Sequence, residues 1–293
     1  MNIDKTKYTG IFTALLTPFD KEGKVNHNTL EKLVKFNVEK GVKGFYVCGS
    51  TGEAFLLSAD ERKAIMETVK AAAPDSTLIA HIGTLNQNDA IALGKHANKL
   101  GYDAVSSVAP FYYKFTFDEI KNYYFTLANE SELPMLVYHI PTFSGVNMGM
   151  NEMSTFLSDD RFLGINYTSN DFFTLEQCKA NFPEKVVYNG FDEMFMSALP
   201  MGADGSIGST FNFMADKFVA IHKLFSENKI AEAQAIQKEA NRIITVLCKI
   251  GVMIAEKEIL NQLGFDFGGC KPPFGAITEE GKELIRKEII PYI

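Results

Sequence analysis

Short apolar segments alternate along the chain with longer segments of helical periodicity. The apolar segments are rich in β-branched residues, and we predict strands at residues 10–16, 44–48, 77–82, 104–108, 135–139, 162–166, 185–189 and 205–207. Between the first two, Leu30, Leu33, Val34 and Val38 have the spacing that places apolar side chains on one face of a helix. Parallel strands joined by crossover helices produce this alternation.

Two of the predicted helices carry a capping box at their start. Ser58 pairs with Glu61, and Thr116 pairs with Glu119. In each pair a side-chain hydroxyl and a carboxylate satisfy backbone N–H groups that the first helical turn leaves free. These pairs predict where the helices after the second and fourth strands begin.

The strand and helix units fill residues 10 to about 228 and match a closed barrel better than an open sheet, which typically has about five or six strands. Beyond Asn228 the pattern is helical only, over residues 230–250, 252–263 and 279–290. We therefore predict an α/β fold, a (β/α)8 TIM barrel at residues 1–228 with a C-terminal helical extension at 229–293. We expect the two parts to pack as one structural unit.

Composition and charge mainly exclude function classes. The chain has 293 residues, of which 46% are hydrophobic and 22% are charged, so disorder and coiled coil are excluded. The net charge of -7 argues against a nucleic acid partner, because phosphate binding needs a concentrated basic surface. No stretch approaches the roughly 18 apolar residues that span a bilayer, so we expect no membrane partner.

The cysteines indicate a reducing compartment. Cys48, Cys178, Cys248 and Cys270 are far apart and form neither a C-x-x-C pair nor a disulfide-dense framework. The first residues lack the cationic and apolar segments of a signal peptide. We expect a cytoplasmic protein.

The candidate chemistry lies where the predicted strands end, because a (β/α)8 barrel builds its site from these ends and the loops that follow. The residues there are small, polar and rich in hydroxyl groups: 49–53 (Gly-Ser-Thr-Gly-Glu), 110–113 (Pro-Phe-Tyr-Tyr), 138–141 (Tyr-His-Ile-Pro), 166–168 (Asn-Tyr-Thr), 190–193 (Gly-Phe-Asp-Glu) and 208–210 (Gly-Ser-Thr).

Each of these features has a structural and a functional interpretation. The turn at 49–53 can present backbone N–H groups and two hydroxyls to a carboxylate or phosphate, or it can be an ordinary glycine-rich turn. Tyr138 can transfer a proton or be a buried structural tyrosine. Asp192 and Glu193 can bind sugar hydroxyls or favour a helix start.

Metal and thiol chemistry are disfavoured. His81 and His139 lie near strand ends, but neither a paired histidine motif nor clustered carboxylates accompany them. Cys48 falls in an apolar strand, where a packed thiol is the usual outcome. We expect a pocket for a small, oxygen-rich anion, with no metal and no cofactor.

Taken in order, these motifs resemble the pyruvate-dependent class I aldolases of the dihydrodipicolinate synthase and N-acetylneuraminate lyase superfamily. The likeness covers almost the whole chain. Residues 190–194 (Gly-Phe-Asp-Glu-Met) and 144–148 (Ser-Gly-Val-Asn-Met) look like the N-acetylneuraminate lyase (sialic acid aldolase) branch. Dihydrodipicolinate synthases usually carry an Arg after their Tyr-x-x-Pro, and residues 142–144 here are Thr-Phe-Ser.

The resemblance implies a carbon–carbon lyase that reversibly cleaves N-acetylneuraminate into N-acetylmannosamine and pyruvate. It implies that Tyr138 transfers the proton. It also implies that Tyr112, or alternatively Tyr113, completes a catalytic Ser-Tyr-Tyr hydrogen-bond relay with Ser50 and Tyr138 of a neighbouring subunit, in a homotetramer that is a dimer of dimers. It implies that Ser50 and Thr51 bind the pyruvate carboxylate. It also implies that the sugar hydroxyls are bound by a second group of residues, Thr168, Gly190, Asp192, Glu193 and Ser209.

Asn166 departs from the family pattern Gly-x-Lys-x-[Thr/Ser], in which the Lys forms a Schiff base with pyruvate. An Asn amide is neither a nucleophilic amine nor a cationic electron sink. We therefore predict little or no aldolase turnover. Asn166 marks either an inactivated lyase that still binds substrate or a natural sugar-acid binding protein or sensor; another pyruvate aldolase such as dihydrodipicolinate synthase, or a hydratase-type proton transfer, stays open.

Overall fold

A computed structural model describes residues 4–293, and its eight parallel strands close into a barrel in sequence order. The predicted range 1–228 thus begins with three residues that lie outside the described part. The strands are β1 (Gly10–Ala14), β2 (Gly44–Val47), β3 (Thr77–His81), β4 (Ala104–Val108), β5 (Met135–His139), β6 (Phe162–Tyr167), β7 (Val186–Asn189) and β8 (Gly205–Gly208). The predicted (β/α)8 fold is confirmed.

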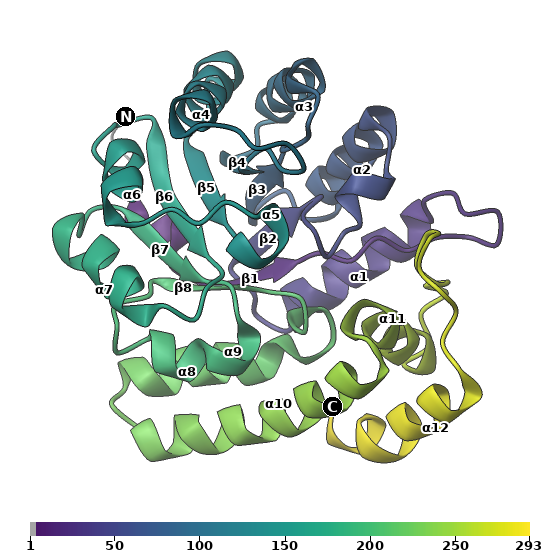
Figure 1. Cartoon of the computed structure of the whole chain (residues 1–293). Helices are drawn as coiled ribbons and strands as arrows, with labels where there is room; N and C mark the ends of the chain where they lie inside the picture. The colour runs from purple at the N-terminus through teal and green to yellow at the C-terminus, as the bar shows by residue number, and fades with distance from the viewer. Residues whose placement is uncertain (1–3) are drawn as a thin grey trace.

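Helices follow every strand and surround the barrel (Figure 1). They are α1 (His27–Glu39), α2 (Ala59–Ala72), α3 (Gln87–Lys99), α4 (Phe117–Ser131), α5 (Pro141–Ser144), α6 (Met150–Leu157), α7 (Phe172–Asn181), α8 (Phe195–Ala198) and α9 (Phe211–Ser226). Short 3-10 helices add η1 (Lys5–Tyr8), η2 (Ala54–Leu56) and η3 (Asp192–Met194). Both predicted capping boxes are present at the starts of α2 and α4.

Several predicted boundaries were wrong by one or two residues. The first strand ends at Ala14 because the backbone N–H of Leu16 donates to the Asn212 side chain and not to a neighbouring strand. Cys48 adopts a positive φ of 59° and so leaves β2, although its thiol is buried as predicted. Val38 is 43% exposed, so the last turn of α1 extends beyond the apolar layer that buries Leu30.

The C-terminal extension consists of three helices that lie along one side of the barrel (Figure 1). These are α10 (Ile230–Ile250), α11 (Val252–Gln262) and α12 (Glu279–Glu288), followed by the 3-10 helix η4 (Ile290–Tyr292). The predicted last helix, 279–290, stops earlier because Ile289, with a φ of -120° and a ψ of -58°, leaves the helical conformation and separates α12 from η4. Within residues 4–293, no helix is both long and apolar enough to cross a membrane.

Two apolar layers hold the barrel together. One lies between the strands and the surrounding helices, and the other fills the barrel interior with side chains that include Phe12, Tyr46, Leu136, Tyr138 and Tyr188. Side chains on a strand alternate between these two layers. Residues that point inward near a strand's C-terminal end therefore face the mouth of the barrel.

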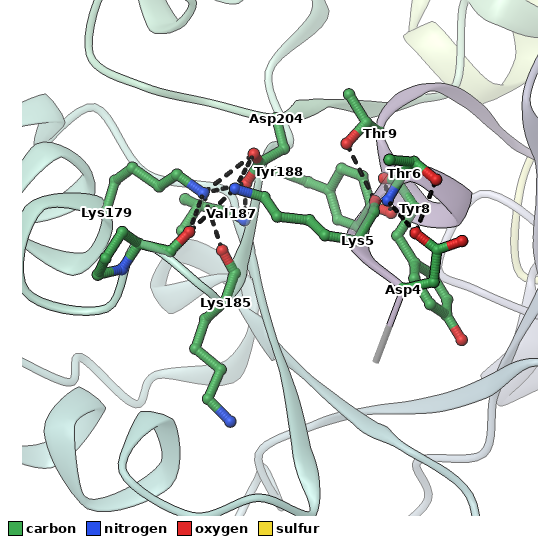
Figure 2. Close-up of polar contacts among 11 residues, drawn as sticks. Asp4, Lys5, Thr6, Tyr8, Thr9, Lys179, Lys185, Val187, Tyr188 and Asp204 are labelled. Atoms are coloured by element: carbon green, nitrogen blue, oxygen red, sulfur yellow. Dashed lines mark hydrogen bonds and ion pairs between the residues drawn. The ribbon is translucent and has the colours of Figure 1, made fainter. Parts of the chain in front are cut away.

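The opposite end of the barrel is closed by η1 and an ionic cluster. The amino groups of Lys5 and Lys179 converge on the Asp204 carboxylate, each at 2.8 Å (Figure 2). Burial lowers the pKa of Lys179 to about 8, against the opposing effect of Asp204. The Tyr8 hydroxyl donates to the Asp103 carbonyl at 2.8 Å. Because η1 and these contacts close this end, we expect ligand to enter at the C-terminal ends of the strands.

Candidate active site

Tyr138 and Asn166 lie side by side on neighbouring strands at the mouth of the barrel. They are paired in register between β5 and β6, and Asn166 is also paired with Tyr188 on β7. Tyr138 and Tyr188 belong to the interior layer, and residues paired in register point to the same face of a sheet. Asn166 therefore points inward as well, and its Oδ1 is buried without a hydrogen-bond partner.

The phenol of Tyr138 lies among hydroxyl groups and aromatic rings. Burial raises its pKa, while hydrogen bonding to Ser50 and Thr168 acts in the opposite direction. The rings of Tyr46 and His81 pack edge-on against it, with centroids 5.8 Å and 6.0 Å away. The structure thus brings Ser50, Thr168 and Tyr138 together, as a proton relay would require.

The turn at Gly49–Glu53 is fixed from behind by the C-terminal extension. Glu53 has a φ of 57° and is buried, with its carboxylate paired to the ammonium of Lys257 on α11. Its Oε2 also accepts a hydrogen bond from the Lys271 backbone at 2.7 Å. Ser50 and Thr51 are half-buried on the same turn. Their hydroxyls and backbone are therefore held in place by contacts from outside the barrel.

Gly190 lies against two of these residues. A Cβ atom at this position would be 1.9 Å from Thr168 Oγ1 and 3.2 Å from Asn166 Oδ1. The Gly190 N–H also donates to the Tyr167 carbonyl at 2.9 Å, which fixes the backbone in this close approach. Only glycine fits here without displacing Thr168.

We therefore expect Gly190→Ala to destabilise the fold by about 1–3 kcal/mol, the usual cost of overpacking a well-packed region. Urea unfolding measures this change. Gly269→Ala is the matched control, because a Cβ there would meet no atom within 4 Å. An equal loss of stability in both variants would contradict the close approach.

Asp192 is buried at the start of η3 on the loop after β7. Its Oδ2 accepts from the backbone N–H of Thr210 at 2.9 Å and from the Thr210 hydroxyl at 2.7 Å. Burial raises the pKa of Asp192 to about 7, despite these hydrogen bonds. Gln237 on α10 donates to the Asp192 carbonyl at 3.0 Å, so the extension also fixes this loop. Glu193 is exposed beside it.

Sequence reasoning missed Glu256 on α11. Its Oε1 lies 2.6 Å from the Ser209 hydroxyl, and the side chain is fully buried. The one available signal was its position in the apolar stripe of this helix, next to Ala255 and one turn before Ile259 and Leu260. A carboxylate in such a stripe must find a polar partner inside the protein.

Tyr112 is not brought to the other site residues within this chain. It is 84% exposed, has a φ of 74° and packs its ring against Tyr113. Within residues 4–293 its hydroxyl forms no hydrogen bond with Ser50 or Tyr138. Its predicted role in a neighbouring subunit is therefore not tested by one chain.

The two histidines near the strand ends are buried and neutral. Nε2 of His81 accepts from the Val108 backbone at 3.2 Å, so Nδ1 carries the proton toward the Cys48 carbonyl. Burial lowers the pKa of His81 to about 3 and that of His139 to about 4. The described residues contain no group of three or more His, Cys, Asp or Glu side chains that could hold a metal ion.

Comparison with known proteins gives one consistent family. Residues 7–290 match the dihydrodipicolinate synthetase family. The N-acetylneuraminate lyase of Histophilus somni (strain 2336) is 42% identical over 282 residues, which cover 96% of this chain and 97% of that protein.

Solved structures agree with this match. CdNal from Clostridium difficile, in complex with mannosamine, has a TM-score of 0.95 at 39% identity and covers 97% of this chain and 99% of its own. A catalytic lysine mutant of Ruminococcus gnavus sialic acid aldolase has a TM-score of 0.93 at 30% identity, and the match covers 97% of this chain and 95% of that protein. The chain is thus similar in fold to an aldolase studied without its catalytic lysine.

Proposed function

Because the chain belongs to the dihydrodipicolinate synthetase family, whose fold and relatives are those of class I aldolases, we propose that it is an N-acetylneuraminate lyase in which Asn166 has removed the Schiff-base amine. It binds N-acetylneuraminate, or pyruvate with N-acetylmannosamine, and turns them over little or not at all. The single observation that carries this proposal is Asn166, paired with Tyr138 at the mouth of the barrel.

The positions of the other residues support the roles that we propose for them. Ser50 and Thr51 bind the pyruvate carboxylate on a turn that the Glu53 ion pair holds in place. Tyr138 takes the proton of the hydroxyl next to the breaking carbon–carbon bond, a step that its hydrogen bonding to Ser50 and Thr168 supports. The sugar hydroxyls meet Thr168, Gly190, Asp192, Glu193 and Ser209.

The missing step is the formation of an electron sink. In aldol cleavage by this family, an amine adds to the keto carbon and water leaves, and the resulting iminium accepts the electron pair of the breaking bond. The Asn166 amide can only donate or accept hydrogen bonds, so the carbonyl remains a weak acceptor of electrons. Within residues 4–293 the two buried lysines are engaged elsewhere, with Lys257 paired to Glu53 and Lys185 donating to the carbonyls of Asp159 and Phe162.

Incubating the protein with pyruvate and borohydride, followed by intact mass measurement, tests this proposal. We expect no covalent adduct, because no site amine is free to form the imine that borohydride reduces. Calorimetry on the same sample should still detect N-acetylneuraminate binding. A reduced pyruvate adduct would overturn the inactive assignment, and the peptide that carries it would identify the amine.

A non-catalytic binding protein or sensor for a sugar acid is the second candidate, and Asn166 is also the observation that favours it. Such a protein needs the same carboxylate and hydroxyl contacts but gains from losing turnover. The two candidates differ in whether a lysine at position 166 is sufficient for cleavage, which is taken up in the Discussion.

The exposed aromatic pair favours assembly as a homotetramer built from tight dimers. Tyr112 and Tyr113 are 84% and 65% exposed, and their rings are perpendicular with centroids 5.1 Å apart. Exposed aromatic residues of this kind are typical of protein interfaces. In the proposed assembly Tyr112 reaches the Ser50 and Tyr138 hydroxyls of the partner subunit.

The free thiols favour a reducing compartment. Cys48 and Cys178 are buried, and Cys248 is an exposed free cysteine. Burial raises the pKa of the Cys48 thiol to about 11, so it is unreactive. We place the protein in the cytoplasm on this basis.

A further inference from the structure

Glu256 is a buried carboxyl group that the proposed reaction does not use. It belongs to α11 of the C-terminal extension, yet it contacts Ser209 on the loop after β8, with Oε1 and Oγ 2.6 Å apart. The side chain has no exposed surface, and Oε2 has no hydrogen-bond partner. Such a contact is short, as hydrogen bonds to carboxyl groups are.

The groups around Glu256 carry no free positive charge. Asp192 on η3 disfavours the ionised form of Glu256, and burial raises the pKa of the Cys270 thiol, an effect to which Glu256 adds. Lys257, the next residue on the helix, is paired with Glu53. Within residues 4–293, neither Glu256 nor Asp192 forms an ion pair, and the pKa of Glu256 rises to about 8 because of burial, with Asp192 adding to the effect and Ser209 opposing it.

The position of the proton decides what Ser209 can offer to a ligand. In neutral Glu256 a proton on Oε2 would be a buried donor without an acceptor, which is costly, whereas a proton on Oε1 would be donated to Ser209 Oγ, 2.6 Å away. The Ser209 hydroxyl hydrogen is then free to donate to a ligand. When Glu256 is ionised, Ser209 must donate to Oε1 and can only accept from a ligand.

We propose that Glu256 is a positioning residue that sets the direction of the hydrogen bond at Ser209, and so selects a sugar acid that presents an acceptor oxygen at this point. The inference rests on the proposed function, because it takes Ser209 as a substrate contact. When Glu256 is neutral, the only negative charge that it and Asp192 can place beside an anionic ligand is that of Asp192.

Binding of N-acetylneuraminate should therefore weaken as Glu256 loses its proton. By calorimetry we expect the affinity of the unchanged protein to fall roughly tenfold between about pH 7.5 and 9.5, the scale of one lost hydrogen bond. In Glu256→Gln the amide N–H donates to Ser209 at every pH, so the affinity should stay nearly constant over this window. A step near pH 7 from Asp192 is shared by both proteins.

Glu258→Gln is the matched control on the same helix, because Glu258 instead accepts from Gln262 at 2.9 Å. It should keep the pH dependence of the unchanged protein. If Glu256→Gln loses affinity in parallel with the unchanged protein, the inference is wrong. A purely structural role for Glu256 would lower stability without changing this pH profile.

A measurement without ligand separates this inference from the proposed function. In protein labelled with 13C at glutamate carboxyl groups, the NMR signal that disappears in Glu256→Gln should titrate near pH 8. Ser209→Ala should raise its midpoint, because the Ser209 hydrogen bond favours the ionised form. If the protein does not bind N-acetylneuraminate, the proposed function fails, and an unchanged midpoint in Ser209→Ala would overturn the inference itself.

Discussion

Asn166→Lys is expected to create N-acetylneuraminate lyase activity at least roughly 10³-fold above that of the unchanged chain, the scale on which removal of a covalent nucleophile acts. The new side chain would enter a position paired with Tyr138 and bordered by Thr168 and Gly190. Its amine would supply the iminium that Asn cannot form. Pyruvate release from N-acetylneuraminate, coupled to lactate dehydrogenase and NADH, measures the gain.

Asn166→Gln is the matched control for this gain. It lengthens the side chain at the same position without adding an amine, so it should remain inactive. Absence of pyruvate release by Asn166→Lys, with intact folding, would favour a binding protein or sensor. Dihydrodipicolinate synthesis in its place would reassign the second substrate.

Lys257→Met is expected to lower the free energy of unfolding by about 3–5 kcal/mol, because breaking a buried ion pair leaves one charge uncompensated. The Lys257 and Glu53 side chains are 1% and 0% exposed. Lys257 also donates to the Gly269 carbonyl at 3.0 Å and lies 4.2 Å from the Phe19 ring centroid. Urea denaturation measures the loss, and it should be accompanied by weaker binding of pyruvate, because Glu53 holds the turn that carries Ser50.

Lys24→Met provides the comparison for an exposed ion pair. Lys24 and Glu22 are 75% and 73% exposed, so its removal should cost less than about 1 kcal/mol. The double variant Glu53→Gln/Lys257→Met should recover part of the stability, because no buried charge is then left alone. A loss for Lys257→Met as small as that for Lys24→Met would show that the buried pair contributes little.

Much of the fold and part of the site could be predicted from local pattern. The alternation of apolar segments with segments of helical periodicity predicted the barrel. This was possible because the spacing of apolar side chains within a strand or helix depends only on residues close together in the sequence. The barrel rule then placed Ser50, Tyr138, Asn166 and Asp192 at one end. The boundary at 228/229 and the roles of these residues stay predictions.

The sequence by itself thus determined the class of fold, the end of the barrel at which Ser50, Tyr138 and Asn166 lie, and the absence of a lysine at residue 166. Only the tertiary structure placed Tyr138 beside Asn166, and only it joined Glu53 to Lys257 and Ser209 to Glu256. The physical reason is that closure of the barrel and docking of the extension bring distant residues into contact. The local periodicity of apolar residues does not predict which distant residue a buried carboxyl group contacts.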